Sequence, residues 1–425
     1  MDKKFIDSTQ SLINFIKASP TCFQAVEEIE KTLKEAGFLH LEENTRFNIK
    51  EGKSYFIKRN SSSLIAFKIP ESYKGFSIIA SHTDSPTFKL KNNCEFVKDE
   101  KYTVVNTEGY GGMLLAPWFD RPLSIAGRVF IKQENEVEEK LVKIDKDLLT
   151  IVNLAIHQNR DANKGIEYKK QVDMLPILSL GNKKGAINSL IAETLNVKED
   201  QILSSDLFLY NRTEASIWGL DNEMYSSPRI DDLQGVYTSL NALINTEPSS
   251  YINMALFLDN EEVGSGTKQG ALSDFLKITI DRIANSLKWD VEDKAIYQAN
   301  SFMVSSDNGH ALHPNYSQVN DVVNKPVLNG GVLIKHSANQ KYTTDAASEA
   351  LFKFILDKEG IPYQEFVNNS DVLGGSTLGN LISRSYSIST IDIGAAQLAM
   401  HSPYETGGTM DTFYLIKAME AFYRR

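Results

Sequence analysis

The stretch INMALFLDNEEVGS (residues 252–265) joins a mostly apolar run to two adjacent carboxylates, Glu261 and Glu262. A short apolar run of this kind is typical of a strand that is buried on both faces of a sheet. Neighbouring carboxylates repel each other, so they are unfavourable directly after a buried strand unless solvent or a cation offsets the repulsion. The pair therefore indicates either a solvated turn or a functional site at the end of the strand.

Strands and helices alternate around this stretch. Downstream, apolar runs such as SFMVSS and SYSISTIDIG alternate with amphipathic helical patterns such as TTDAASEALFKFILDKEG, which ends in glycine. Upstream, KSYFIKR, SSLIAFKIP and GFSIIASHTDSP indicate further strands. This alternation predicts an α/β fold, and we expect a three-layer α/β/α core with a mixed, mostly parallel sheet.

The middle of the chain has a different pattern. KYTVVNTEGYGGMLLAPWF and LSIAGRVFIKQ alternate like antiparallel strands, with glycine and proline between them. DKDLLTIVNLAIHQNRDANKG (145–165) and GAINSLIAETLN (185–196) have mixed helical character. We therefore predict a discontinuous α/β domain, residues 1–91 and 225–425, interrupted by a β-rich insert at residues 92–224.

Composition excludes several classes of protein. The 425 residues include 45 basic and 55 acidic side chains without a lysine/arginine cluster, so we expect no nucleic-acid partner. Cys22 and Cys94 lie far apart, which argues against a disulfide framework or a cysteine-rich zinc site. The start lacks the apolar region of a signal peptide, and no run approaches the roughly 20 apolar residues of a membrane helix. We expect a cytoplasmic protein with no membrane partner.

Every predicted core strand ends in a histidine or a carboxylate. In open α/β sheets, ligands bind outside the carboxyl ends of the strands. Imidazole and carboxylate groups are ligands of zinc, and several anionic ligands can hold two cations close together. The candidates are His82 and Asp84 after GFSIIA, Glu261 and Glu262 after INMALFL, Asp307, His310 and His313 after SFMVSS, His401 after SISTIDIG, and Asp231 and Asp232 in the helix-opening SPRIDDLQG.

Each of these residues alone has an ordinary structural explanation. The two glutamates can be solvated turn residues, His82 a core histidine, and Asp84 and Asp231 helix N-caps. However, four separate strand ends all deliver residues that can bind a metal, and this coincidence favours a metal site. Because neighbouring side chains diverge at a strand end, one glutamate can bind a metal while the other accepts a proton from a metal-bound water.

Five blocks appear in the order found in the aspartyl aminopeptidase family of dinuclear zinc peptidases, and the chain resembles that family over nearly its whole length. The resemblance implies an aminopeptidase that hydrolyses N-terminal residues from peptides through a metal-bound hydroxide. Within it, Glu261 resembles the general base, and Asp84 resembles a carboxylate that orients the first metal-binding histidine. The blocks are ASHTDSP, SPRIDDLQG, DNEEVGSGTKQGA, SSDNGHALHPNY and QLAMHSPYE.

The same resemblance implies two divalent metal ions in each subunit. His82, Asp231 and Asp307 resemble the ligands of one ion. Asp231, Glu262 and His401 resemble the ligands of the other, with Asp231 bridging the two. We expect Zn²⁺, although Mn²⁺ and Co²⁺ also accept these ligands.

The resemblance extends to substrate binding and assembly. His157 resembles a histidine that enters a neighbouring subunit's active site, and Lys335 a lysine beside the side-chain pocket, where it would favour acidic Asp or Glu substrates. Gly374 opens GGSTLG, which resembles a loop lining the substrate cleft. His310 is a candidate to hold the oxyanion. The family also implies that the insert is a dimerisation and lid domain, and that dimers of this homo-oligomer form a tetrahedral dodecamer.

Two other functions stay open from the sequence alone. A carboxypeptidase or deacylase would use the same dinuclear site. A shell-forming binding protein would carry a vestigial site, but all five candidate metal positions hold residue types that can bind a metal. The resemblance to aminopeptidases favours peptide substrates.

Overall fold

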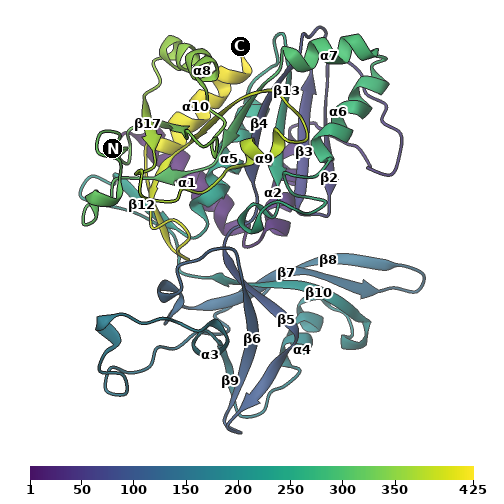
Figure 1. The fold of residues 1–425 in the computed structure, drawn as a ribbon. Coiled ribbons are helices and arrows are strands. Elements are labelled where there is room, and N and C mark those ends of the chain that lie inside the picture. The colour runs from purple at the N-terminus through teal and green to yellow at the C-terminus, as the bar shows by residue number, and fades with distance from the viewer. The chain divides into compact units, whose positions relative to one another are not determined.

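The computed structural model describes residues 1–425, which form two compact units (Figure 1). The first unit comprises Met1–Asp84, Ala215–Met400 and Glu405–Arg425, and the second comprises Ser85–Glu214 and His401–Tyr404. The first unit contains a large and a small sheet, the second unit contains one sheet, and each unit has its own buried hydrophobic residues. No helix in the structure combines the length and hydrophobicity that a membrane-spanning segment needs.

A nine-stranded mixed sheet forms the centre of the first unit. Five neighbouring pairs are parallel, and the pairs β2–β3, β3–β13 and β16–β18 are antiparallel. In spatial order the strands are β1 (Leu39–His40), β2 (Lys53–Arg59), β3 (Ser63–Ile69), β13 (Ile252–Leu258), β4 (Phe76–His82), β14 (Phe302–Ser306), β18 (Ser389–Gly394), β16 (Val332–His336) and β17 (Tyr363–Val367).

Successive side chains of the central strands pack into two different cores. In β4, Ile79 joins one hydrophobic cluster, whereas Ile78 and Ala80 join the other. The two clusters lie on opposite faces because side chains alternate along a strand. Both faces are therefore buried, which explains why β4 and β13 are apolar at nearly every position.

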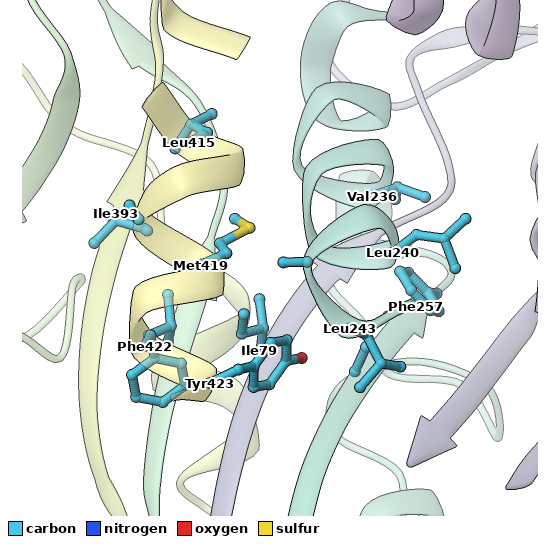
Figure 2. Close-up of a cluster of buried hydrophobic side chains, with 14 of the residues drawn as sticks. Ile79, Val236, Leu240, Leu243, Phe257, Ile393, Leu415, Met419, Phe422 and Tyr423 are labelled. Carbon is cyan, nitrogen blue, oxygen red and sulfur yellow. The ribbon is translucent and has the colours of Figure 1, made fainter. Parts of the chain in front are cut away.

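Helices cover both faces of this sheet and complete three layers (Figure 1). Figure 2 shows Val236, Leu240 and Leu243 of one helix beside Met419 and Tyr423 of another, above the strands. One cluster takes residues from α1 (Lys3–Ala18), α2 (Cys22–Glu35), α5 (Ile230–Asn245), α8 (Ala346–Glu359) and α10 (Asp411–Tyr423), and the other from α6 (Phe275–Ser286) and α9 (Leu378–Ile382). The remaining helix of this unit is α7 (Val291–Ala299).

Local signals set the ends of α8. The Asp345 side chain accepts a hydrogen bond from the backbone nitrogen of Ser348 at 2.8 Å, which caps the first turn. Gly360 follows the helix with φ of 64°, a conformation that glycine adopts without steric cost. The amphipathic pattern and the glycine stop in the sequence thus correspond to a real helix.

A second, small sheet belongs to the same unit. Its strand order is β11 (Ser216–Trp218), β12 (Met224–Ser227), β20 (Glu405–Gly408), β19 (Ala396–Leu398) and β15 (Gly309–His310). Within the connection between β19 and β20, His401–Tyr404 group with the second unit. The predicted fold class, an α/β core with an inserted β-rich part, is confirmed.

The second unit is built on a six-stranded antiparallel sheet. Its strand order is β8 (Val137–Lys143), β7 (Leu123–Lys132), β10 (Ile202–Asn211), β5 (Thr87–Lys98), β6 (Tyr102–Tyr110) and β9 (Ile177–Leu180). The short helix α3 (Lys170–Asp173) and the helix α4 (Ala186–Leu195) complete it. Ile187 and Ile191 of α4 are buried in the core of this unit.

The expected helical character of residues 145–165 is wrong. This stretch holds isolated bridges, such as Leu123 to Leu149 and Thr150 to Ile177, and a single turn of 3-10 helix at Ala162–Lys164. Leu149 and Ile151 are buried against the sheet. The apolar residues of this stretch lie in an extended segment that pairs with strands, so tertiary contacts outweigh the local helical pattern.

A charged triad crosses three neighbouring strands of the second unit. Asp206 of β10 accepts from Lys89 Nζ of β5 at 2.7 Å and from Arg128 Nε of β7 at 2.9 Å. Partial burial alone would raise the pKa of Asp206, but the two cations outweigh it and hold the pKa below its ordinary value of 3.8. Gly127 of β7 lies against Asp206 of β10, and an added Cβ on Gly127 would lie 2.0 Å from the Asp206 carbonyl oxygen. The close pairing of these two strands therefore requires glycine at position 127.

We expect Asp206→Asn to lower the free energy of unfolding by about 1–2 kcal/mol at pH 7, because two charge-assisted hydrogen bonds lose the carboxylate. A lowered pKa stabilises the fold above the ordinary pKa, and this stabilisation is lost as the pH falls through the folded-state value. The difference from the unmodified protein should therefore shrink below about pH 4. Urea unfolding at several pH values measures this, with the exposed Asp161→Asn as control; a constant difference would contradict it.

Candidate metal centre

Three neighbouring parallel strands bring their carboxyl ends to one edge of the sheet. β13 pairs with β4 and β4 pairs with β14, with Leu258 opposite His82. His82 is the last residue of β4, and Asp307 directly follows β14. Glu261 and Glu262 lie in a single 3-10 turn, Glu261–Val263, just beyond β13. The topology therefore places side chains that are far apart in the sequence at one edge.

Within this edge, His82, Asp231 and Asp307 form a buried cluster. Their side-chain ligand atoms all lie within 4.8 Å of one another, and His82 Nε2 is 3.4 Å from Asp231 Oδ1. His82, Glu261 and Glu262 form a second group that meets the same distance limit. His82 is 1% exposed and Asp231 is 3% exposed, so these groups have left bulk water almost completely.

The His82 ring is held in a fixed orientation. Its Nδ1 lies 3.1 Å from the backbone oxygen of Asp84 and 3.4 Å from Asp84 Oδ1. Oxygen atoms on that side accept a hydrogen bond from Nδ1, which directs the Nε2 lone pair toward Asp231. This is the arrangement of a metal-binding histidine whose other nitrogen bonds to an oriented acceptor.

Asp84 also holds the turn that carries the two glutamates. Its Oδ1 accepts from the backbone nitrogen of Glu261 at 3.2 Å, and its Oδ2 accepts from that of Glu262 at 3.1 Å. One carboxylate therefore contacts both the histidine that ends β4 and the turn after β13. It fixes the two strand ends relative to each other.

Asp231 and Asp232 open α5 with different roles. Their backbone dihedrals are non-helical, and the peptide bond between them is cis. Asp232 accepts from the backbone nitrogens of His82 and Gly235, both at 3.2 Å, so it connects the helix start to β4. Asp231 joins the cluster by its side chain, and its backbone nitrogen donates to Glu405 Oε2 at 3.1 Å.

The crowded carboxylates shift each other's protonation. Burial raises the pKa of Asp307 to about 6, although the Lys335 ammonium opposes this. Burial raises the pKa of Glu261 to about 8, and neighbouring carboxylates, Asp307 and Asp84 among them, add to the increase. Burial by itself lowers the pKa of His82, but the surrounding carboxylates raise it well above its ordinary value. The field therefore favours a positive charge at this edge.

These residues fit a zinc ion. Zinc takes imidazole nitrogen and carboxylate oxygen, and His82, Asp231 and Asp307 present that set of donors from three different elements. The negative field that favours a proton on His82 equally favours a metal cation. Glu261 and Glu262 lie close enough to His82 to contribute further oxygen ligands.

A buried hydrogen-bond network supports the cluster, and sequence reasoning missed its members. Asn308 Nδ2 donates to Gln397 Oε1 at 2.8 Å, and Gln397 Nε2 donates to Glu405 Oε1 at 3.3 Å. Glu405 in turn accepts from the Asp231 backbone. Asn308 follows Asp307, and Glu405 ends the block QLAMHSPYE, so their only sequence signal was proximity to candidate ligands.

The other predicted residues of the first unit lie outside the cluster. Lys335, 2% exposed, points its Nζ to within 3.7 Å of Asp307 Oδ1 and 5.3 Å of the Tyr342 ring centroid. The exposed His310 lies in β15 with its ring 6.3 Å from the Phe366 ring. Gly374 lies in an irregular segment before α9.

His157 and His401 belong to the second unit. His157 is exposed in a turn. His401 has φ of 65°, and its Nδ1 lies 2.6 Å from the backbone oxygen of Gly112. When Nδ1 donates its hydrogen to this carbonyl oxygen, Nε2 keeps its lone pair, and a metal-binding histidine needs that lone pair.

Comparison with known proteins gives a consistent result. Residues 15–423 match the family described as aminopeptidase I zinc metalloprotease (M18). The chain is 45% identical over 430 residues to a probable M18 family aminopeptidase 2 of Clostridium acetobutylicum, and the match covers 99% of each chain.

Solved structures agree with the sequence matches. A chain in the cryo-EM structure of the Ape4 and Nbr1 complex superposes with a TM-score of 0.96 and 34% identity, covering 99% of this chain and 86% of that one. A chain of the S. cerevisiae mApe1 dodecamer superposes with a TM-score of 0.87 and 27% identity, covering 97% of this chain and 95% of that one.

Asp84→Asn should weaken metal binding about 10–100-fold. The new amide nitrogen cannot accept the hydrogen bond from the backbone nitrogen of Glu261 or Glu262, and the negative charge beside the His82 ring is lost. Zinc affinity by competition with a chelator measures the effect. Asp274→Asn changes an exposed carboxylate, 62% accessible in its ion pair with Arg59, and should leave the affinity unchanged. Equal affinities in both variants would exclude this orienting role.

Proposed function

Because the chain belongs to the aminopeptidase I zinc metalloprotease (M18) family and is a metal-dependent aminopeptidase, we propose how its residues divide the work of peptide hydrolysis. The observation that carries the proposal is the convergence of His82, Asp231 and Asp307, with Glu261 and Glu262 beside them, at one sheet edge. Peptides are the substrates, and their N-terminal residues are removed one at a time.

Two divalent ions per subunit are part of the proposal, with zinc supported by the family. His82, Asp231 and Asp307 would hold one ion. Asp231, Glu262 and His401 would hold the other, so that the Asp231 carboxylate bridges both. In support, the two histidines have their Nδ1 atoms against oxygen acceptors, which makes Nε2 available to a metal.

When bound, the metal ions supply Lewis acidity, which polarises the scissile carbonyl and makes a water molecule a stronger acid. Glu261 then acts as the general base: its carboxylate accepts a proton from the attacking water and returns it to the amine of the leaving peptide. Its position supports this role, since Glu261 lies beside His82 and Glu262, two of the residues that would hold the ions. Asp84 fixes the turn by accepting from the Glu261 backbone.

The two glutamates have unequal roles in this proposal. Adjacent residues direct their side chains differently, so one can bind metal while the other faces the substrate. Both backbone nitrogens donate to the Asp84 carboxylate, so neither side chain is needed to hold the turn in place. The resemblance to the family motif is the basis for assigning Glu262 to the metal and Glu261 to the proton.

We expect Glu261→Gln to lower kcat about 10³-fold or more while the protein keeps its full zinc content, because only the proton acceptor is lost. Glu262→Gln is the matched comparison and should reduce the zinc content itself. Aminoacyl p-nitroanilide hydrolysis and elemental analysis of the same samples measure both properties. Near-normal hydrolysis by the Glu261→Gln variant would refute the assignment.

Substrate recognition is proposed for residues around this edge. Lys335 would contribute positive charge near the side-chain pocket and favour acidic N-terminal residues. Its ammonium lies near Asp307, so the charge stands close to the cluster. His310 would help to hold the developing oxyanion, and the segment that begins at Gly374 would line the cleft.

The acidic preference has a direct test. Lys335→Met should raise KM for Asp and Glu substrates about tenfold and change KM for Leu substrates much less, because the lost charge matters only to an anionic side chain. Steady-state kinetics on a panel of Asp, Glu, Leu and Lys substrates measures this. Equal changes for all four would show that Lys335 supports the site without selecting the substrate.

We also propose that the protein is a homo-oligomer. The related S. cerevisiae mApe1 forms a dodecamer. In this chain the second unit would mediate dimerisation, and dimers would assemble into a tetrahedral dodecamer. The exposed position of His157 suits a residue that enters the active site of a neighbouring subunit.

A further inference from the structure

A second cluster of metal-type ligands lies in the first unit, apart from the edge described above. His336 ends β16, Glu365 lies in the neighbouring parallel strand β17, and Glu349 lies in the first turn of α8. Their ligand atoms lie within 4.8 Å of one another, and each of the three residues is partly exposed. Three separate elements thus direct one imidazole and two carboxylates to one point.

Strand alternation separates this cluster from the candidate metal centre. Lys335 and His336 are adjacent in β16, so their side chains lie on opposite faces of the sheet. Lys335 points to Asp307 at 3.7 Å. His336 shares its face with Ile334, which packs in the same core as residues of α8. The His336 cluster therefore faces α8 and shares no ligand with the cluster around His82.

The distances within the cluster are close to the spacing that a small cation requires. His336 Nε2 is 2.6 Å from Glu365 Oε2 and 3.8 Å from Glu349 Oε1. A nitrogen and an oxygen 2.6 Å apart share a proton in a hydrogen bond, so His336 and Glu365 must move slightly apart to admit a metal ion. Tetrahedral zinc, with bonds near 2.0 Å, sets its ligands about 3.3 Å apart. The two observed separations bracket that value, so small rotations of these partly exposed side chains would suffice.

We propose that His336, Glu349 and Glu365 form an additional zinc site, with water in the fourth position. One imidazole and two carboxylates are ligands that zinc accepts. Partial exposure gives the ion access from solvent, in contrast to the buried edge around His82. This site does not depend on the proposed roles in peptide hydrolysis.

Lys353 controls the strength of this site. Its Nζ lies 2.5 Å from an oxygen of Glu349 and 2.5 Å from an oxygen of Glu365. On Glu365 the lysine contacts Oε1 while His336 meets Oε2, so the two contacts use different oxygens. The ammonium neutralises one of the two negative charges and competes with a metal cation. Removing it should leave both carboxylates to the ion.

The alternative is a purely structural network of hydrogen bonds and ion pairs around Lys353, with no metal ion. Such a network would also keep α8 against β16 and β17. The two interpretations differ in zinc stoichiometry and in the effect of Lys353, because a structural network loses its central cation when Lys353 is removed.

The test uses the full-length protein loaded with its active-site metal ions and titrated with ZnCl₂ in a calorimeter. The unmodified protein should bind one zinc equivalent more than His336→Gln or Glu365→Gln. Lys353→Met should bind this extra equivalent about tenfold more tightly, since a competing positive charge is gone. His40→Ala is the control, because His40 Nδ1 pairs with the single carboxylate of Glu42 at 3.3 Å. It should bind like the unmodified protein.

Two outcomes would overturn the proposal. One is an equal zinc stoichiometry for the unmodified protein, His336→Gln and Glu365→Gln. The other is the absence of an extra equivalent in both the unmodified protein and Lys353→Met. Circular dichroism of each variant shows whether it is folded, and the use of two independent ligand substitutions keeps the test decisive if one of them misfolds.

Discussion

Repulsion between buried carboxylates at one edge of the central sheet is the constraint on which the rest of the structure depends. Asp231 and Asp307 crowd around His82 with little access to water, and the partly exposed Glu261 lies beside His82. Charges of one sign in such a place need positive partners or strong hydrogen-bond donors to remain. The backbone donors directed at Asp84 and Asp232, and the cations that this edge favours, are responses to that single requirement.

The supporting groups are as important to this edge as the ligands themselves. Asp84 holds the histidine of one strand and the turn of the next, while Asp232 connects the start of α5 to β4. Glu405 extends the hydrogen bonding into the small sheet. The positions of the ligand residues therefore depend on side chains that need not contact a substrate. In surroundings of low dielectric constant, a buried polar group without its hydrogen-bond partner lowers the stability of the fold.

Sequence patterns predicted the fold class because strands buried on both faces are apolar at almost every position and end abruptly in polar residues. The same logic located His82 and Asp307, and the helix-opening segment SPRIDDLQG supplied Asp231; the structure brings these three residues together. Residues 145–165 were predicted wrongly, since their apolar spacing fits both a helix and an extended segment packed on a sheet. Gln397 and Glu365 could not be recognised, because their partners come from distant segments and no local spacing marks them.

The alternation of side chains in β16 has a consequence for how this chain tolerates change. Lys335 belongs to a buried polar interior and His336 to a half-exposed surface, although one peptide bond joins them. Inserting or deleting a single residue within the strand would exchange their surroundings, placing an ammonium against α8 and an imidazole in the interior. The length of β16 is therefore more strictly constrained than its composition, and homologous segments can be exchanged in protein engineering only if they keep the same number of residues.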